Sequence, residues 1–223
     1  MAAILESSAH YIPDEAMLKI LGKPTSINVR KVLWLCEELA QPYALEPWGA
    51  GYRDTNTPEF LALNPNAMVP VIVDGDAVLW ESNTICRYLA GKAGRADLLP
   101  AGALARARVE QWMDWQAGEL NNSWRYAFMS LVRQSAAHRD AAAVAASAAA
   151  WNRHMAILDD QLGRGDAFVA GPTFTLADIV IGLSVNRWFM TPIGRPALPN
   201  VQAYYDRLAE RAGFRQHGRN GTP

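Results

Sequence analysis

The ordered pattern of apolar residues begins at residue 17. A short apolar run over 17–21 predicts a strand, which ends at Gly22-Lys-Pro24. Residues 28–40 then predict a helix, because their apolar positions lie three and four residues apart. Trp34 and Leu35 widen this apolar stripe, so we expect the helix to bury two of its sides. A second strand is predicted over 43–48.

A hairpin and another helix follow a polar, turn-rich stretch. Apolar runs over 69–73 and 77–80 flank an Asp-Gly turn, which is the pattern of a β-hairpin. A short helix is expected near 58–63, before the hairpin, and a longer one over 82–89, after it. The order strand, helix, strand, hairpin, helix indicates an α/β module over residues 17–92.

Helical periodicity dominates the rest of the chain. After a linker at 93–103, rich in Gly, Ala and Pro, an all-α domain is predicted over 104–223. Thr175 and Asp178 have the spacing of a capping box at the start of one of its helices. The predicted helices span residues 104–132, 141–162, 179–189 and 201–212. Residues 1–16 lack periodicity and are expected to form an N-terminal extension.

The composition is that of a globular protein with a real core. Half of the 223 residues are hydrophobic and 19% are charged, which is too apolar for a disordered chain. The formal net charge of −1 argues against nucleic acid or an anionic membrane as a partner, since both would favour a basic excess.

Cysteine and histidine usage narrows the chemistry further. Cys36 and Cys86 lie within apolar helical patterns and are expected to be buried free thiols, which excludes a disulfide scaffold. No Cys/His spacing typical of a metal site occurs, so we expect no metal cofactor. The N-terminus lacks the features of a signal peptide, and Ala141–Ala150 is too short to cross a bilayer. A soluble, cytoplasmic protein is therefore expected.

Three local features of the α/β module point to one ligand site. Thr25-Ser26-Ile-Asn28 precedes the first helix, Val69-Pro70 opens the hairpin, and Glu81-Ser82 starts the next helix. A helix N-terminus offers backbone N–H groups and the positive end of the helix dipole. A cis peptide before Pro70 would turn the backbone of Val69 outward, where an extended peptide can pair with it.

Taken together, these segments resemble a known family. The runs TSINVRKVLW and NPNAMVPVIVDGDAVLWESNTICRYLA, followed by a helical domain with FTLAD, are similar to the cytosolic glutathione transferases. Bacterial members related to the theta and nu classes resemble this chain best, over about residues 17–215. The resemblance implies a thioredoxin-like domain over 17–92 that binds glutathione, a C-terminal helical bundle domain, a homodimer, and an electrophile bound between the two domains.

The resemblance also implies roles for residues before the first helix. Ser26 matches the serine whose hydroxyl contacts the glutathione sulfur, and Asn28 matches the asparagine of the nu-like pattern. Thr25 is the alternative to Ser26, because zeta-like members have paired hydroxyls at this turn. Helix capping alone also explains a Ser or Asn at this position, so both interpretations stay open.

Further positions match residues that hold the rest of glutathione. Val69 matches the residue whose backbone pairs with the cysteinyl part, and Glu81 and Ser82 match the pair that binds the γ-glutamyl group. One position departs from the pattern: Met68 stands where many members have a lysine that holds the glycyl carboxylate. Arg53, in the preceding loop, is the candidate replacement.

The second substrate is expected against the helix at 104–132 and the helix near Trp188. Trp115 and Arg125 fall off the apolar stripe of the first of these helices and are candidates for the pocket, as is Trp188 beside Arg187. These side chains indicate a bulky apolar or aromatic electrophile.

The predicted function is that of a glutathione transferase, with glutathione as co-substrate. Two alternatives share the site: a glutathione-dependent disulfide or peroxide reductase, and a non-catalytic ligand-binding protein of the same fold. The loss of lysine at Met68 favours the second alternative.

Overall fold

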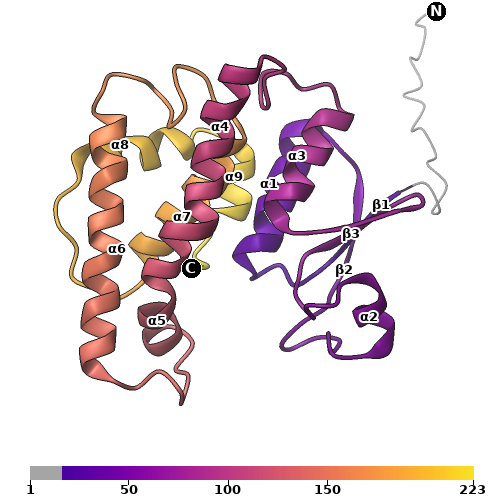
Figure 1. Cartoon of the computed structure of the whole chain (residues 1–223), viewed down its shortest axis with the longest axis horizontal. Helices are drawn as coiled ribbons and strands as arrows, with labels where there is room; N and C mark the ends of the chain where they lie inside the picture. The colour runs from indigo at the N-terminus through magenta and orange to yellow at the C-terminus, as the bar shows by residue number, and fades with distance from the viewer. Residues whose placement is uncertain (1–16) are drawn as a thin grey trace, which may run out of the picture.

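A four-stranded sheet forms the first part of the computed structural model, which describes residues 17–223 (Figure 1). The extension predicted over 1–16 lies outside the described residues. The strand order is β2-β1-β3-β4, with β1 parallel to β2 and antiparallel to β3. The strands are β1 (Leu18–Leu21), β2 (Tyr43–Glu46), β3 (Val71–Asp74) and β4 (Ala77–Trp80). The predicted hairpin is the β3–β4 pair.

The central strands β1 and β3 bury side chains on both faces of the sheet, since alternate residues of a strand point to opposite sides. Ile20 and Ile72 face the main core, which includes α1 (Ile27–Leu39) and α3 (Ser82–Lys92). On the other face, Leu21 and Val71 form a smaller cluster with Phe60 of α2 (Pro58–Leu63) and with Trp48. The short helix expected near 58–63 therefore closes the second face.

Helix α1 lies between the sheet and the helical part of the molecule (Figure 1). Every residue from Val29 to Cys36 is buried, which confirms that the helix buries more than one side. Trp34 packs against Phe174 and Phe214, with ring centroids 5.8 and 5.0 Å away. A Cβ at Gly213 would lie 2.3 Å from the Trp34 ring, so only glycine fits there.

The second part of the chain is helical throughout, as predicted. It consists of α4 (Ala103–Trp115), a π-turn (Gln116–Leu120), α5 (Asn121–Leu131), α6 (Ala141–Leu162), α7 (Leu176–Met190), α8 (Pro199–Leu208) and α9 (Ala212–His217). The fold is thus a thioredoxin-like α/β domain followed by an all-helical domain, in agreement with the sequence prediction. None of the helices in the described part combines the length and apolarity needed to span a membrane.

The single helix predicted over 104–132 is wrong in its middle. The π-turn Gln116–Leu120 separates α4 from α5 and adds residues to one turn, which rotates all that follows. Trp124, which follows the π-turn, is buried. The last predicted helix, 201–212, corresponds to α8, which ends at Leu208, and α9 follows it.

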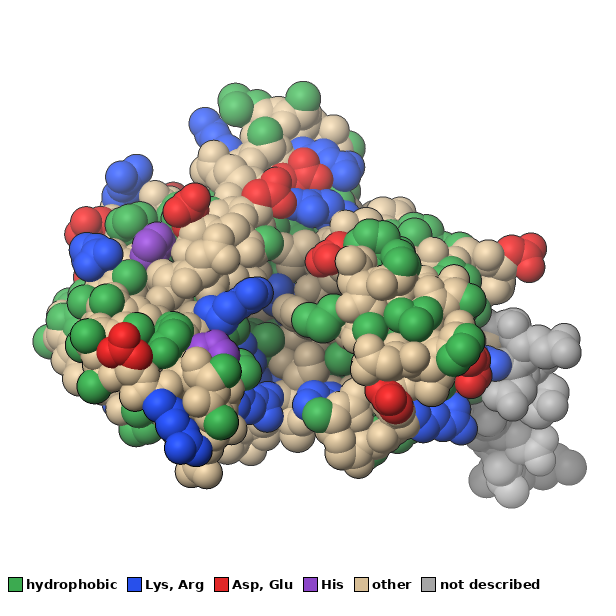
Figure 2. Space-filling model, turned by 60° about the horizontal axis from the view of Figure 1, so that its bottom comes forward, with side chains coloured by type: hydrophobic (Ala, Val, Ile, Leu, Met, Phe, Trp, Pro, Cys, Tyr) green, Lys and Arg blue, Asp and Glu red, His purple; other side chains and the backbone are tan. Residues whose placement is uncertain are grey.

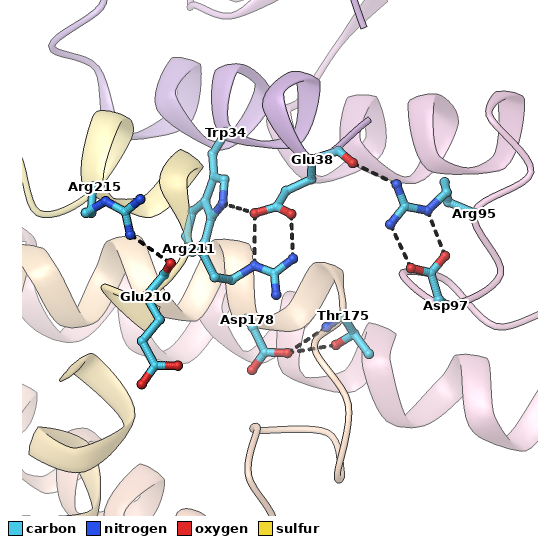
Figure 3. A network of polar contacts seen from close by, with 9 residues as sticks. All are labelled: Trp34, Glu38, Arg95, Asp97, Thr175, Asp178, Glu210, Arg211 and Arg215. Atoms are coloured by element: carbon cyan, nitrogen blue, oxygen red, sulfur yellow. Dashed lines mark hydrogen bonds and ion pairs between the residues drawn. The ribbon is translucent and has the colours of Figure 1, made fainter. Parts of the chain in front are cut away.

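Polar contacts fix the start of α7 and join the two domains (Figure 3). The Asp178 carboxylate accepts a hydrogen bond from the Thr175 N–H at 2.8 Å, as the predicted capping box requires, and a further one from the Thr175 hydroxyl at 3.1 Å. Glu38 at the end of α1 accepts from Trp34 and forms an ion pair with Arg211, before α9. The domains are therefore held by paired charges as well as by the core.

Candidate functional site

Ser26 stands at the N-terminus of α1, where the sequence predicts the sulfur contact. It occupies the N-cap position with an extended backbone, but its hydroxyl makes no capping hydrogen bond. The side chain is half-buried and has no hydrogen-bond partner among residues 17–223. Capping therefore does not occupy this hydroxyl, and it is free to donate to a ligand at the positive end of the helix dipole.

The loop before β3 presents the backbone of Val69. The Val69–Pro70 peptide is cis. Asn64 is 2% exposed and shapes this loop: its amide donates to the Met68 carbonyl at 2.8 Å, and its carbonyl oxygen accepts from the Asn66 N–H at 3.0 Å. Asn64 thus holds the approach to Val69 from inside the protein.

Glu81 and Ser82 form the turn from β4 into α3. Glu81 has φ +70° and ψ 108°, a conformation that costs a non-glycine residue on the order of 1–3 kcal/mol. Its side chain is exposed, whereas Ser82 is 5% exposed. Strained residues of this kind are concentrated at ligand sites.

The loop before β3 and the turn into α3 meet Asn28 of α1 in a small cleft with a volume of about 80 Å³. Its walls are formed by the ends of α1 and α3 and by the loop before β3. The lining residues are Asn28, Asn64, Met68, Val69, Pro70, Glu81 and Ser82. Four residues that the sequence predicts to bind glutathione or its sulfur, from three separate segments, therefore lie around one opening.

A larger cleft of about 460 Å³ lies between the two domains. Met68, which is 62% exposed, borders both clefts and makes them neighbours. Figure 2 shows Lys and Arg side chains beside the hollow between the two halves of the molecule. The lining residues of this interdomain cleft are Lys23, Ser26, Ile27, Met68, Trp124, Arg125, Phe128, Met129, Arg133, His138 and Arg187.

Buried polar groups support the α1 and α3 ends of the site. The ammonium of Lys31 donates to Asn83 at 3.1 Å and to Gln116 at 2.8 Å, and Asn83 donates to the Met113 carbonyl. Burial lowers the pKa of Lys31 to about 8. Asn83 follows Ser82 directly, so this network fixes the first turn of α3 against the helical domain.

Two of the residues predicted to bind glutathione or its sulfur lie outside both clefts. Thr25 is exposed and borders neither cleft. Arg53 lies 3.6 Å from the Glu46 carboxylate, and its guanidinium lies 5.2 Å from the centre of the Trp48 ring. Of the two candidate hydroxyls, that of Ser26 belongs to a residue that lines a cleft, and that of Thr25 does not.

The three residues predicted for the electrophile pocket separate. Arg125 lines the interdomain cleft. Trp115 packs instead against Trp112 and His154, and the buried Trp188 donates its indole N–H to Asn152. Neighbours on a helix point about 100° apart, so Arg187 faces the cleft while Trp188 faces away from it.

Both cysteines are buried, as the sequence predicts. Burial raises the pKa of each thiol to about 12, so neither provides a thiolate near neutral pH. Sequence reasoning missed Lys23 as a residue that lines the interdomain cleft. It also missed that Asn64 supports the loop before Val69, although Asn64 belongs to the NPN run quoted for the family resemblance. Within the described residues, no three His, Cys, Asp or Glu side chains gather to hold a metal ion.

Comparisons with known proteins agree with this geometry. The family model "Glutathione S-transferase, N-terminal domain" matches residues 25–92, and "Glutathione S-transferase, C-terminal domain" matches 141–207. Glutathione S-transferase GstB of Escherichia coli is 37% identical over 202 residues, which cover 90% of this chain and 97% of that protein. Glutathione S-transferase 3 of Zea mays is 34% identical over 209 residues, covering 90% and 93%.

A solved glutathione S-transferase structure is similar to this chain in three dimensions as well. It is the theta class glutathione S-transferase from Xanthomonas axonopodis pv. citri with glutathione bound. The TM-score is 0.85 at 38% identity, and the match covers 91% of this chain and 97% of that one.

Proposed function

Because this chain belongs to the glutathione S-transferase family, we propose that it transfers the sulfur of glutathione to a small electrophile, with the thiolate stabilised by Ser26. The free hydroxyl of Ser26, which lines the interdomain cleft two residues before Asn28 of the small cleft, is the observation that carries this proposal. A sulfur held at Ser26 is within reach of glutathione-binding groups in the small cleft and of an electrophile in the interdomain cleft.

In the proposed binding mode, glutathione runs from the small cleft to the interdomain cleft. Its γ-glutamyl group lies at Glu81 and Ser82, its cysteinyl backbone pairs with Val69, and its sulfur meets Ser26. Glu81 supplies a carboxylate for the ammonium group, while the N-terminus of α3 and Ser82 receive the α-carboxylate. Asn28 borders the small cleft beside Ser26 and is placed to donate a second hydrogen bond.

For the glycyl carboxylate we propose Lys23 in place of Arg53. A Cβ on Gly49 would lie 3.7 Å from Lys23 Cδ and 3.9 Å from Val69 Cγ2, so Lys23 and Val69 flank the same glycine. Lys23 also lines the interdomain cleft, whereas Arg53 is engaged with Glu46 and Trp48. Lys23 thus supplies the cation that is lost at Met68.

The energetics of thiolate formation are within the reach of these groups. A free thiol has a pKa of about 8.5, and lowering it by about two units requires about 2.7 kcal/mol. A hydroxyl that donates to the thiolate contributes about 1.5–3 kcal/mol, and a helix N-terminus adds about 0.3–1. The proton leaves to solvent, the sulfur then bonds to the electrophilic carbon, and the leaving group departs with its electron pair. Ser26 is a hydrogen-bond donor and forms no covalent bond.

The test is to titrate the thiolate absorbance of bound glutathione against pH in the wild type and in Ser26→Ala. We expect the bound thiol to titrate below its value in buffer, and Ser26→Ala to return it most of the way. Conjugation at neutral pH should fall about tenfold or more in that variant. Thr25 borders neither cleft, so Thr25→Ala serves as the control variant. An unchanged pKa in Ser26→Ala would remove the mechanism, and turnover of a disulfide without conjugation would favour reductase chemistry.

We further propose that the protein is a cytoplasmic homodimer, as the family resemblance implies. Apolar side chains remain partly exposed on the outer strand β4, at Val78 and Trp80, and Leu104 on α4 is exposed. A second copy would cover surface of this kind. Light scattering of the purified protein measures its mass in solution, and a monomer at all concentrations would contradict the dimer.

A further inference from the structure

The interdomain cleft contains a buried positive charge that has no carboxylate partner among residues 17–223. The side chain of Arg187, on α7, is 3% exposed and lines this cleft. Its guanidinium forms no ion pair and no hydrogen bond within residues 17–223, and its Nε is buried without any partner. An isolated buried cation is strongly unfavourable, so it is retained only where something compensates it.

Among the described residues, this guanidinium stacks on two aromatic rings. Its carbon Cζ lies 4.5 Å from the centre of the Trp124 ring and 4.1 Å from that of Phe128. Stacking fixes the plane of the group and leaves its N–H donors without acceptors. Arg187 is therefore a rigid donor whose acceptors are absent from the described part of the chain.

Further cations border the same cleft. Arg125 and Arg133 on the α5 side are exposed and form no ion pair within residues 17–223, and Lys23 lies opposite them. None of the residues lining the cleft is Asp or Glu. Burial lowers the pKa of Arg187 well below its usual range, and burial together with the charge of Arg133 lowers the pKa of Lys23. The cations that line the interdomain cleft thus have no acidic side chain beside them in its lining.

Glutathione alone does not account for this excess. Its glycyl carboxylate is one negative charge, which Lys23 satisfies in the proposed binding mode. The guanidinium groups of Arg125, Arg133 and Arg187 remain. They surround a space that also has apolar walls, from Phe128 and Trp124.

We propose that the interdomain cleft selects an electrophile that carries a carboxylate on an apolar or aromatic body, with the carboxylate held by Arg187 and Arg133. This inference rests on the proposed transferase function, because it names the class of its second substrate. The planar guanidinium of Arg187 suits a carboxylate, which it can bind through two parallel hydrogen bonds. The aromatic rings beneath it pack against the apolar body.

A matched pair of probes isolates the carboxylate. In para-(bromomethyl)benzoate and its methyl ester, the glutathione sulfur bonds to the same benzylic carbon, and bromide leaves with the electron pair of the broken bond. The thiol proton is released to solvent. The two probes differ in the negative charge at the far end of the ring, so the ratio of their kcat/KM values measures recognition of that charge.

The variants are Arg133→Gln and Arg187→Gln, with Arg153→Gln as the matched control. Arg153 is exposed on α6 and borders neither cleft, so its variant removes one positive charge elsewhere. We expect the wild type to prefer the carboxylate, each cleft variant to lose about tenfold or more of kcat/KM for it, and the ester to change little. Arg133 is exposed, so Arg133→Gln decides the matter if Arg187→Gln does not fold.

A selective loss in either cleft variant supports the proposal. Equal effects on both probes in both variants, or a wild type that prefers the ester, would overturn it. Calorimetry with the unreactive para-toluate and with para-methylbenzyl alcohol gives an independent result. If the wild type conjugates neither probe, the proposed function fails, but preferential binding of para-toluate that Arg133→Gln abolishes would still establish an anion site. Equal binding of both compounds would remove that site too.

Discussion

The ammonium group of Lys31 lies 2.8 Å from the side-chain oxygen of Gln116, in the core between the two domains. Lys31 belongs to α1, which carries the candidate sulfur site at its N-terminus, and Gln116 opens the π-turn of the helical domain. Gln116 in turn donates to Ser184 on α7 and to Asn121, both at 3.0 Å. One buried glutamine of the π-turn thus connects α1 to α5 and α7.

Gln116→Leu is predicted to destabilise the protein. The change leaves Lys31 with Asn83 as its remaining hydrogen-bond acceptor and leaves Ser184 without its donor. Loss of a buried hydrogen bond to a charged group costs about 1.5–3 kcal/mol. We therefore expect urea unfolding to show a free energy lower by about 2 kcal/mol or more. Gln111→Leu, at an exposed position of α4, should leave it within about 0.5 kcal/mol. Equal effects of the two changes would show that the buried connection is not stabilising.

The same lysine predicts how stability depends on pH. Burial lowers the pKa of Lys31 to about 8 in the folded protein, whereas a lysine in an unfolded chain titrates near about 10.4. Between these values the unfolded chain binds more protons than the folded one, so the free energy of unfolding rises with pH. Relative to Lys31→Met, the wild type should therefore gain about 2 kcal/mol between about pH 7 and about pH 10.

Urea titrations at several pH values measure this difference, and Lys19→Met provides the comparison. Lys19 is a half-buried residue of β1, so its replacement removes a lysine without touching the buried network. If the wild type and Lys31→Met have parallel stability curves across this range, Lys31 keeps its proton in the folded state and the prediction is wrong.

Local sequence patterns were sufficient to predict the α/β domain, and the family resemblance selected the candidate glutathione residues within it. Ser26, Glu81 and Ser82 lie at helix N-termini, and Val69 precedes the hairpin, so short-range patterns of apolar residues and turns place them. The topology then brings these segments to one cleft, because the ends of α1 and α3 and the loop before β3 meet there.

The second half of the site depends on contacts that no local pattern encodes. The helical period continues without a break through Gln116, and it is the hydrogen bonds of this residue to Lys31 and Ser184 that accompany the π-turn. That turn sets the direction of Trp124 and Arg125. Arg187 reaches the cleft only because α7 packs between the domains, which hydrophobic periodicity alone does not reveal.

Lys23 is the proposed replacement for the lysine lost at Met68. If Lys23 holds the glycyl carboxylate, Lys23→Gln should raise the KM for glutathione about five- to tenfold, because a partly buried charged hydrogen bond is lost. The turnover number with saturating glutathione should change less, since the carboxylate is distant from the reacting sulfur. Arg53→Gln should leave both constants nearly unchanged, because Arg53 borders neither cleft. Removing the carboxylate with glutathione amide as substrate should have the same effect on the wild type and none further on Lys23→Gln. A larger effect of Arg53→Gln than of Lys23→Gln would return the role to Arg53.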